Sequence, residues 1–175
     1  RGKDVRQRLD RVAWLGTHFR HWVREDETVV RDLGVNEREQ VSLSNTYSLN
    51  RGIAHEQAAA ILRTYQRIRG ALPPGSPGEW YAIYPPFAKG FDDHSEAWQY
   101  VNGGVSPIFA GELARGAFAH GFEGYGADVL SRVLSPTLCA PTCSVCRFDR
   151  ESSIVSLSAS GFRITPGRTT RASSI

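Results

Sequence analysis

The spacing of apolar residues along the chain predicts a protein built from helices. Over residues 5–23, apolar side chains recur every three or four positions with Arg and Asp between them, the pattern of an amphipathic helix. The same period over 56–69 predicts another helix, with Gly70 at its end. A further helix is expected over about 40–51, where Gly52 can provide a left-handed stop.

The second half of the chain carries the signals of two more helices. Ser106 has the form of an N-cap, and the proline after it suits the first helical position. The helix that follows, over 108–119, is apolar and rich in small residues, and Gly111 and Gly116 would let another helix approach closely. A last helix is expected over about 127–134. The predicted fold class is therefore all-α.

Between and beyond these helices the pattern is lost. Residues 72–78 contain three prolines and two glycines, too many for a regular element, and the irregularity continues to Gly104. Residues 136–175 are rich in Ser, Thr, Arg and Cys without a sustained period. We therefore predict a helical domain over 1–135, with a long irregular loop, and a low-complexity tail over 136–175 that is either disordered or out of frame.

Composition and charge narrow the class of protein. The chain is 41% apolar, and its 21 basic and 18 acidic residues are mixed along the sequence, giving a net charge of +3. Without a long apolar run or a basic stripe, neither a membrane nor a nucleic acid is expected as a partner. The sequence has no methionine and begins within a helical pattern, so we expect a piece of a longer protein. Its compartment stays open.

The irregular loop before residue 104 concentrates the candidate chemistry. Seven of the 18 aromatic residues fall within 21 positions, and these are Trp80, Tyr81, Tyr84, Phe87, Phe91, Trp98 and Tyr100. The same loop carries Asp92, Asp93, His94 and Glu96. Sugars present flat C–H faces and hydroxyl edges, so aromatic rings mixed with carboxylates and amides suit them. The alternative is that a long loop needs apolar anchors of its own.

A family resemblance favours the sugar. The segment 98–107, Trp-Gln-Tyr-Val-Asn-Gly-Gly-Val-Ser-Pro, resembles the Asn-Gly-Gly motif of six-hairpin (α/α)6-barrel glycosidases, which include trehalases, neutral invertases and debranching-type glucosidases. Residues 44–53 and 56–62 are similar to the inner helix, short turn and outer helix of these enzymes, so the resemblance covers about 40–134. The chain departs from the pattern at Val105, where many members have an aromatic residue.

The resemblance implies both a fold and an activity. The helices would form hairpins of an incomplete (α/α)6 toroid, and the remainder of that domain would be the chain's missing partner. The parent reaction would be inverting hydrolysis of a glycosidic bond in a carbohydrate substrate, with the isolated fragment inactive. The sugar-binding residues would be Trp98, Gln99, Tyr100, Asn102, Gly103 and Gly104.

The residue types in the motif fit that role. Gly103 and Gly104 allow the backbone to come close to a ligand, while Gln99 and Asn102 can donate and accept hydrogen bonds with sugar hydroxyls. The alternative is a tight turn before a helix, in which the side chain of Asn102 bonds its own backbone.

Glycoside hydrolysis needs two carboxyl groups across the scissile bond. The candidates lie just before the motif and are Glu96, Asp92 and Asp93. Glu96 is the first choice because it is nearest to the motif. Glu112, on the helix that follows, is expected instead at the surface or in an ion pair with Arg115 or Arg51.

No metal or cofactor is expected. His18 and His21 could share a helix face, but no carboxylate or cysteine completes a site with them, and His55 and His94 have no metal spacing. The three cysteines, Cys-x-x-x-Cys-x-x-Cys from Cys139, have a spacing that radical enzymes use for an iron–sulfur cluster. Because no βα repeat precedes them, free or variably oxidised cysteines are the expectation.

A second class of function stays open on the sequence alone. The chain could be a non-catalytic helical module whose aromatic loop binds a carbohydrate, a protein or a peptide. An exposed Glu96 far from Asn102 would favour that alternative.

Overall fold

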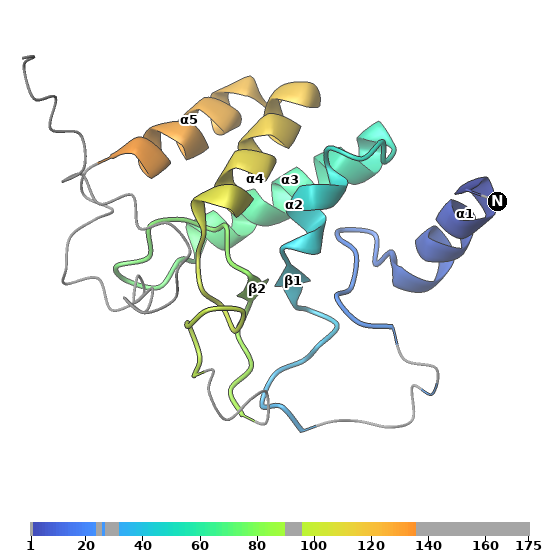
Figure 1. Cartoon of the computed structure of the whole chain (residues 1–175), viewed down its shortest axis with the longest axis horizontal. Coiled ribbons are helices and arrows are strands. Elements are labelled where there is room, and N and C mark those ends of the chain that lie inside the picture. The colour runs from blue at the N-terminus through green and yellow to red at the C-terminus, as the bar shows by residue number, and fades with distance from the viewer. Residues whose placement is uncertain (1, 24–25, 27–31, 90–95, 136–175) are drawn as a thin grey trace, which may run out of the picture.

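The computed structural model describes residues 2–23, 26, 32–89 and 96–135. This part is mostly helical, as predicted, with one short two-stranded sheet (Figure 1). The helices are α1 (Gly2–Ala13), α2 (Ser44–Ser48), α3 (His55–Gly70), α4 (Pro107–Ala119) and α5 (Glu123–Leu134), and the strands are β1 (Val41–Ser42) and β2 (Ile83–Tyr84).

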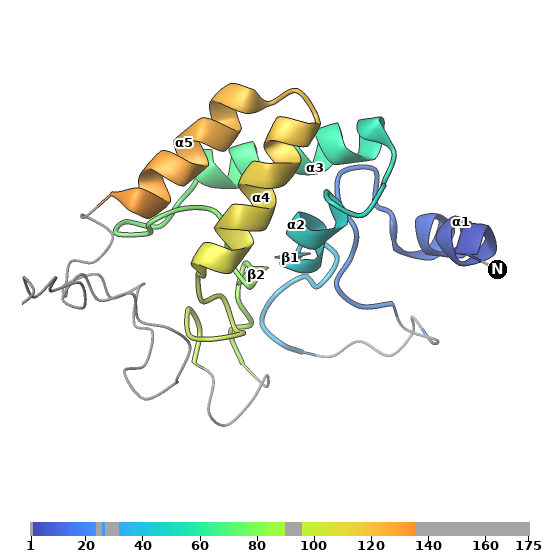
Figure 2. The ribbon, with the colours of Figure 1, turned by 45° about the horizontal axis from the view of Figure 1, so that its top comes forward.

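The core lies where α3, α4 and α5 pack together. In both ribbon views, α4 and α5 run side by side and α3 crosses next to them, while α1 projects away from the group (Figures 1 and 2). Buried side chains of α3 and α4 form much of this core, and the largest of them are Ile61, Leu62, Tyr65 and Leu113. Burial of such side chains, more than helix propensity, stabilises helices of this length in water.

Helix termini follow the local signals. The Ser106 hydroxyl accepts a hydrogen bond from the backbone N–H of Ile108 at 3.3 Å, so the N-cap of α4 is confirmed. Helix α3 ends at Gly70 as predicted. Gly52, expected to stop the preceding helix, adopts a positive φ of 71°.

The two small residues of α4 have different surroundings. A Cβ added at Gly116 would lie 2.5 Å from Cβ of Leu49, so this glycine lets the end of α2 approach α4. A Cβ at Gly111 would meet nothing within 4 Å. The predicted close approach is therefore confirmed at Gly116 and is wrong at Gly111 within the described residues.

The first predicted helix is too long by about ten residues. α1 ends at Ala13, and the chain then turns through Gly16, whose φ is +84°. Tertiary hydrogen bonds hold this turn, because the Asn45 side chain accepts from the Phe19 N–H at 2.8 Å and donates to the Phe19 carbonyl at 2.9 Å. The apolar residues after Ala13, such as Phe19, therefore pack from an irregular segment and do not form one face of a helix.

The helix predicted over 40–51 is also shorter than expected. Only α2 is helical there, because Val41 and Ser42 pair antiparallel with Tyr84 and Ile83 in the small sheet. That pairing joins segments about 40 residues apart and places β2 within the long loop. It is the element that positions the aromatic residues described below.

No helix among the described residues is long and apolar enough to cross a membrane. Residues 136–175, which include the three cysteines, lie outside the described part of the chain.

Candidate functional site

The loop 96–104 is a tight structure that its own backbone holds closed. The Trp98 N–H donates to the Asn102 carbonyl at 2.8 Å, and the Asn102 N–H donates to the Gln99 carbonyl, also at 2.8 Å. The Ala82 N–H then binds the Gly104 carbonyl at 2.7 Å, which ties the loop to the segment before β2. The motif is therefore a folded turn on the edge of the core.

Two aromatic residues of this turn have unusual backbone conformations. Trp98 has a φ of 73° and Tyr100 a φ of 39°, in the left-handed region that side chains with a Cβ rarely adopt. Tyr100 is held outward with 58% of its surface exposed. Such strain persists only where the surrounding structure enforces it, and it concentrates at functional sites.

The two glycines of the motif serve contacts inside the protein. Gly103 has a φ of 92°, and a Cβ there would lie 2.8 Å from Cβ of Pro86. A Cβ at Gly104 would lie 2.4 Å from the Tyr100 carbonyl oxygen. Both glycines thus allow close backbone packing, and the described residues use that freedom to close the turn.

Asn102 holds the turn onto the chain at Phe87. Its side chain accepts a hydrogen bond from the Phe87 N–H at 2.7 Å and donates to the Phe87 carbonyl at 3.1 Å, and only 1% of its surface is exposed. This geometry favours the alternative interpretation of a turn residue, with the difference that the amide bonds the backbone of Phe87 and not its own. Contact of Asn102 with a sugar stays a prediction.

Glu96 and Gln99 lie together on the outer side of the turn. The Gln99 amide nitrogen donates to a carboxylate oxygen of Glu96 at 3.3 Å, and the Glu96 side chain is exposed. The other two carboxylate candidates, Asp92 and Asp93, lie outside the described residues. Glu112 instead pairs with Arg51 at 3.3 Å, one of the two ion pairs considered for it.

An aromatic cluster, formed by Tyr81, Tyr84 and Trp98, backs the turn. The ring centroids of Tyr81 and Tyr84 are 5.1 Å apart in a stacked arrangement, and Trp98 lies 5.5 Å from Tyr81 and 6.2 Å from Tyr84. Offset and tilted pairs at these distances are favourable and rigid. Tyr84 lies at the edge of the cluster, where its ring is only half-buried.

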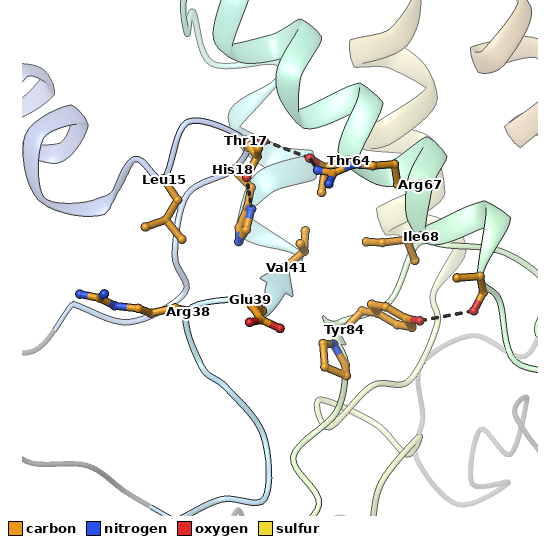
Figure 3. A pocket seen from close by; sticks show the side chains of 12 residues that line it. Leu15, Thr17, His18, Arg38, Glu39, Val41, Thr64, Arg67, Ile68 and Tyr84 are labelled. Carbon is orange, nitrogen blue, oxygen red and sulfur yellow. Dashed lines mark hydrogen bonds between the residues drawn. The ribbon is translucent and has the colours of Figure 1, made fainter.

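That edge opens onto a cavity of about 600 Å³ (Figure 3). Its apolar wall is formed by Leu15, Val41, Ile68 and Tyr84. Its hydrogen-bonding groups belong to Thr17, His18, Arg38, Glu39, Thr64 and Arg67. In Figure 3 the Arg38 side chain extends away from the other labelled side chains. An apolar wall with a few polar groups is the usual composition of a small-ligand site.

His18 is the most unusual group in this cavity. Only 7% of its surface is exposed, and Nδ1 lies 2.9 Å from the Thr17 hydroxyl, while Nε2 has no hydrogen-bond partner within the described part of the chain. Burial lowers the pKa of His18, and the charge of Arg67 lowers it further. The backbone at Arg38 and Gln40 approaches the ring and opposes this shift without a hydrogen bond of normal geometry to Nε2. His18 therefore lines the cavity with a ring that favours the neutral form and whose Nε2 is buried.

Sequence reasoning missed a buried carboxylate in the long loop. Glu79 is fully buried, accepts two hydrogen bonds from the Arg132 guanidinium at 2.8 and 2.9 Å, and accepts one from the Tyr125 hydroxyl at 2.5 Å. Burial and the neighbouring Glu79 charge raise the pKa of Tyr125. The Arg132 guanidinium also lies 4.8 Å from the Trp80 ring centre. With its carboxylate fully engaged, Glu79 ties the loop to α5.

No group of three or more His, Cys, Asp or Glu side chains among the described residues could hold a metal ion. Comparisons with protein-family models, with characterised proteins and with solved structures find no match to this chain. The geometry of the site therefore carries the functional argument.

Proposed function

We propose that this chain contributes part of the sugar-binding site of a glycoside hydrolase with an (α/α)6 toroid. One observation carries the proposal: Tyr84 belongs both to the aromatic cluster and to the wall of the cavity. A rigid aromatic face beside hydrogen-bonding groups is what a sugar ring requires, since it presents apolar C–H faces and polar edges.

Each group of residues in this site has a distinct role in the proposal. The face of Tyr84 would stack on the sugar, and the polar side chains of the cavity wall would bond its hydroxyls. Gln99 and Tyr100 would bind sugar units that extend past the turn, where Glu96 supplies one exposed carboxylate. Hydrolysis needs a second carboxyl group across the scissile bond, which Asp92 or Asp93 or another hairpin of the toroid would provide.

Helix α1 supports an incomplete toroid. Its apolar row, formed by Val5, Leu9 and Val12, is exposed, and the first of these residues has 64% of its surface in contact with solvent. In a toroid of helical hairpins each row of this kind is covered by the next hairpin.

Binding of mono- and disaccharides to the chain, measured by titration calorimetry, tests the proposal. Tyr84→Ala should weaken sugar binding about tenfold, or ~1.4 kcal/mol, because the stacking face is lost. Tyr84→Phe keeps that face and should bind normally. Tyr47→Ala removes an aromatic residue that packs on Phe109, away from the cavity, and serves as the matched control. No sugar binding, or equal binding by Tyr84→Ala, would reject the proposal.

Activity gives a second test. A chain with one part of the ring should hydrolyse disaccharides slowly or not at all, because it cannot hold acid and base together across the bond. Rapid turnover that Glu96→Gln abolishes would show a complete active site and contradict the partial one proposed.

The exposed row of α1 also favours a second candidate, a non-catalytic module that binds an apolar partner segment. In that case replacing Leu9 and Val12 by Ser would abolish partner binding, while Tyr84→Ala would leave it intact.

A further inference from the structure

Two histidines from distant parts of the chain face each other at the surface. His55 is the first residue of α3, and His120 is the C-cap of α4. Their Nδ1 atoms lie 3.3 Å apart, and the ring centroids are separated by 5.5 Å. We propose that this pair is a binding site for a divalent transition metal ion of the zinc class, which joins the start of α3 to the end of α4.

The separation of the two nitrogens fits a shared metal ion. Metal–nitrogen bonds of about 2.0–2.1 Å at a tetrahedral angle place the two donor atoms about 3.3–3.4 Å apart. The Nδ1 atoms of His55 and His120 already have this separation.

The surroundings of His120 set its tautomer. Its Nε2 lies 3.1 Å from the carbonyl oxygen of Leu49, which can only accept a hydrogen bond, so Nε2 carries the proton. In the neutral ring the lone pair is then on Nδ1, the atom that faces His55. A backbone carbonyl on the far nitrogen is the usual outer contact of a metal-bound histidine.

His55 is free to adopt the matching state. Without a metal its Nδ1–H can donate to Nδ1 of His120, and this is the arrangement that the metal replaces. His55 is exposed, so its proton can move through solvent from Nδ1 to Nε2, which leaves the Nδ1 lone pair for the metal. Water molecules complete the coordination, since no third ligating side chain joins the pair among the described residues.

The helix termini contribute opposing effects. The negative end of the α4 dipole attracts a cation to His120, while the positive start of α3 repels it from His55. The affinity therefore comes from coordination by two imidazoles, which favours Zn²⁺, Ni²⁺ and Cu²⁺ over Mg²⁺ and Ca²⁺. This site is separate from the cavity and does not depend on the proposed function.

Calorimetric titration of the 175-residue chain with Zn²⁺ at neutral pH, without an affinity tag, tests the site. The three tail cysteines are replaced by Ser in every variant, because thiolates bind zinc themselves. The parent should bind one ion, and His55→Gln and His120→Gln should each weaken binding at least roughly tenfold. His94→Gln is the matched control and should bind as the parent does. Failure of the parent to bind one ion, or unchanged binding by His55→Gln, would overturn the proposal.

Two further measurements separate this site from a loss of folding. Imidazole resonances of His55 and His120, but not of His18, should shift as Zn²⁺ is added. The thermal transition of the parent should rise with zinc concentration, because the ion binds only where α3 and α4 are folded together. His55→Gln changes an exposed side chain, so it should keep the parent's circular dichroism and lose the zinc-dependent rise. A rise of equal size in that variant would place the ion elsewhere.

Discussion

The side chain of Asn102 closes two hydrogen bonds with the backbone of Phe87, 15 residues earlier in the chain. This pair joins the conspicuous Asn-Gly-Gly turn to the segment that follows β2. The amide of Asn102 bonds the Phe87 backbone as a neighbouring strand would. It thereby holds in place the turn that carries Trp98 of the aromatic cluster, whatever ligand the site takes.

Replacing Asn102 by Ala should therefore lower the free energy of unfolding. The variant loses the two hydrogen bonds between this side chain and the Phe87 backbone, a cost of about 1–3 kcal/mol. Urea denaturation measures this difference. Gln99→Ala is the control in the same turn, because the Gln99 side chain bonds only the exposed Glu96 carboxylate. This substitution should lower the free energy of unfolding by less than about 1 kcal/mol. An unchanged midpoint for Asn102→Ala would mean that the Phe87 contact is not formed.

Two glycines of α4 should respond in opposite directions to alanine. Gly116→Ala would force Leu49 away and should destabilise the fold by about 1–3 kcal/mol. Gly111→Ala enters open space on an exposed helix surface and should stabilise it by about 0.5–1 kcal/mol. Thermal denaturation of the two variants side by side would show the opposite shifts, and a loss of stability in both would contradict the packing described.

Removing the cation from the buried ion pair should be costly. Arg132→Leu leaves the Glu79 carboxylate buried without its charged partner, so the free energy of unfolding should fall by about 3–5 kcal/mol. Arg63→Leu, at an exposed position of α3, should change it by less than about 0.5 kcal/mol. Combining Glu79→Gln with Arg132→Leu removes the unpaired charge and should recover much of the loss. A double variant as unstable as Arg132→Leu would show that the lost packing of Arg132, and not the buried charge, dominates.

Acid should destabilise the fold through His18. Its pKa is lowered by burial, so the unfolded state takes up a proton more readily than the folded state as the pH falls below about 6.5. The stability from His18 is therefore fully present above that pH and is lost as the pH falls through the folded pKa. Urea midpoints measured between about pH 7 and pH 5 should decline less steeply in His18→Gln than in the parent. Parallel curves would place the ring in solvent.

The amino-acid sequence by itself determined the elements whose signals are local. The apolar period and terminal glycine of α3, and the serine cap and proline that begin α4, act between residues one to four positions apart, so their effect is independent of the rest of the chain. The sequence also located the aromatic residues and the carboxylate of Glu96 before the turn, while the exposure of Glu96 comes from the structure.

Only the tertiary structure decided the features that depend on distant partners. The end of α1 is set by the bonds between Phe19 and Asn45, and the strand at Val41 by its pairing with Tyr84. The buried Glu79 carboxylate and the facing histidines likewise join side chains 46 or more residues apart, and the cavity brings together residues from Leu15 to Pro85. A local pattern records the period of a helix but not which residue meets which across the core, so these contacts emerge only when the chain is folded.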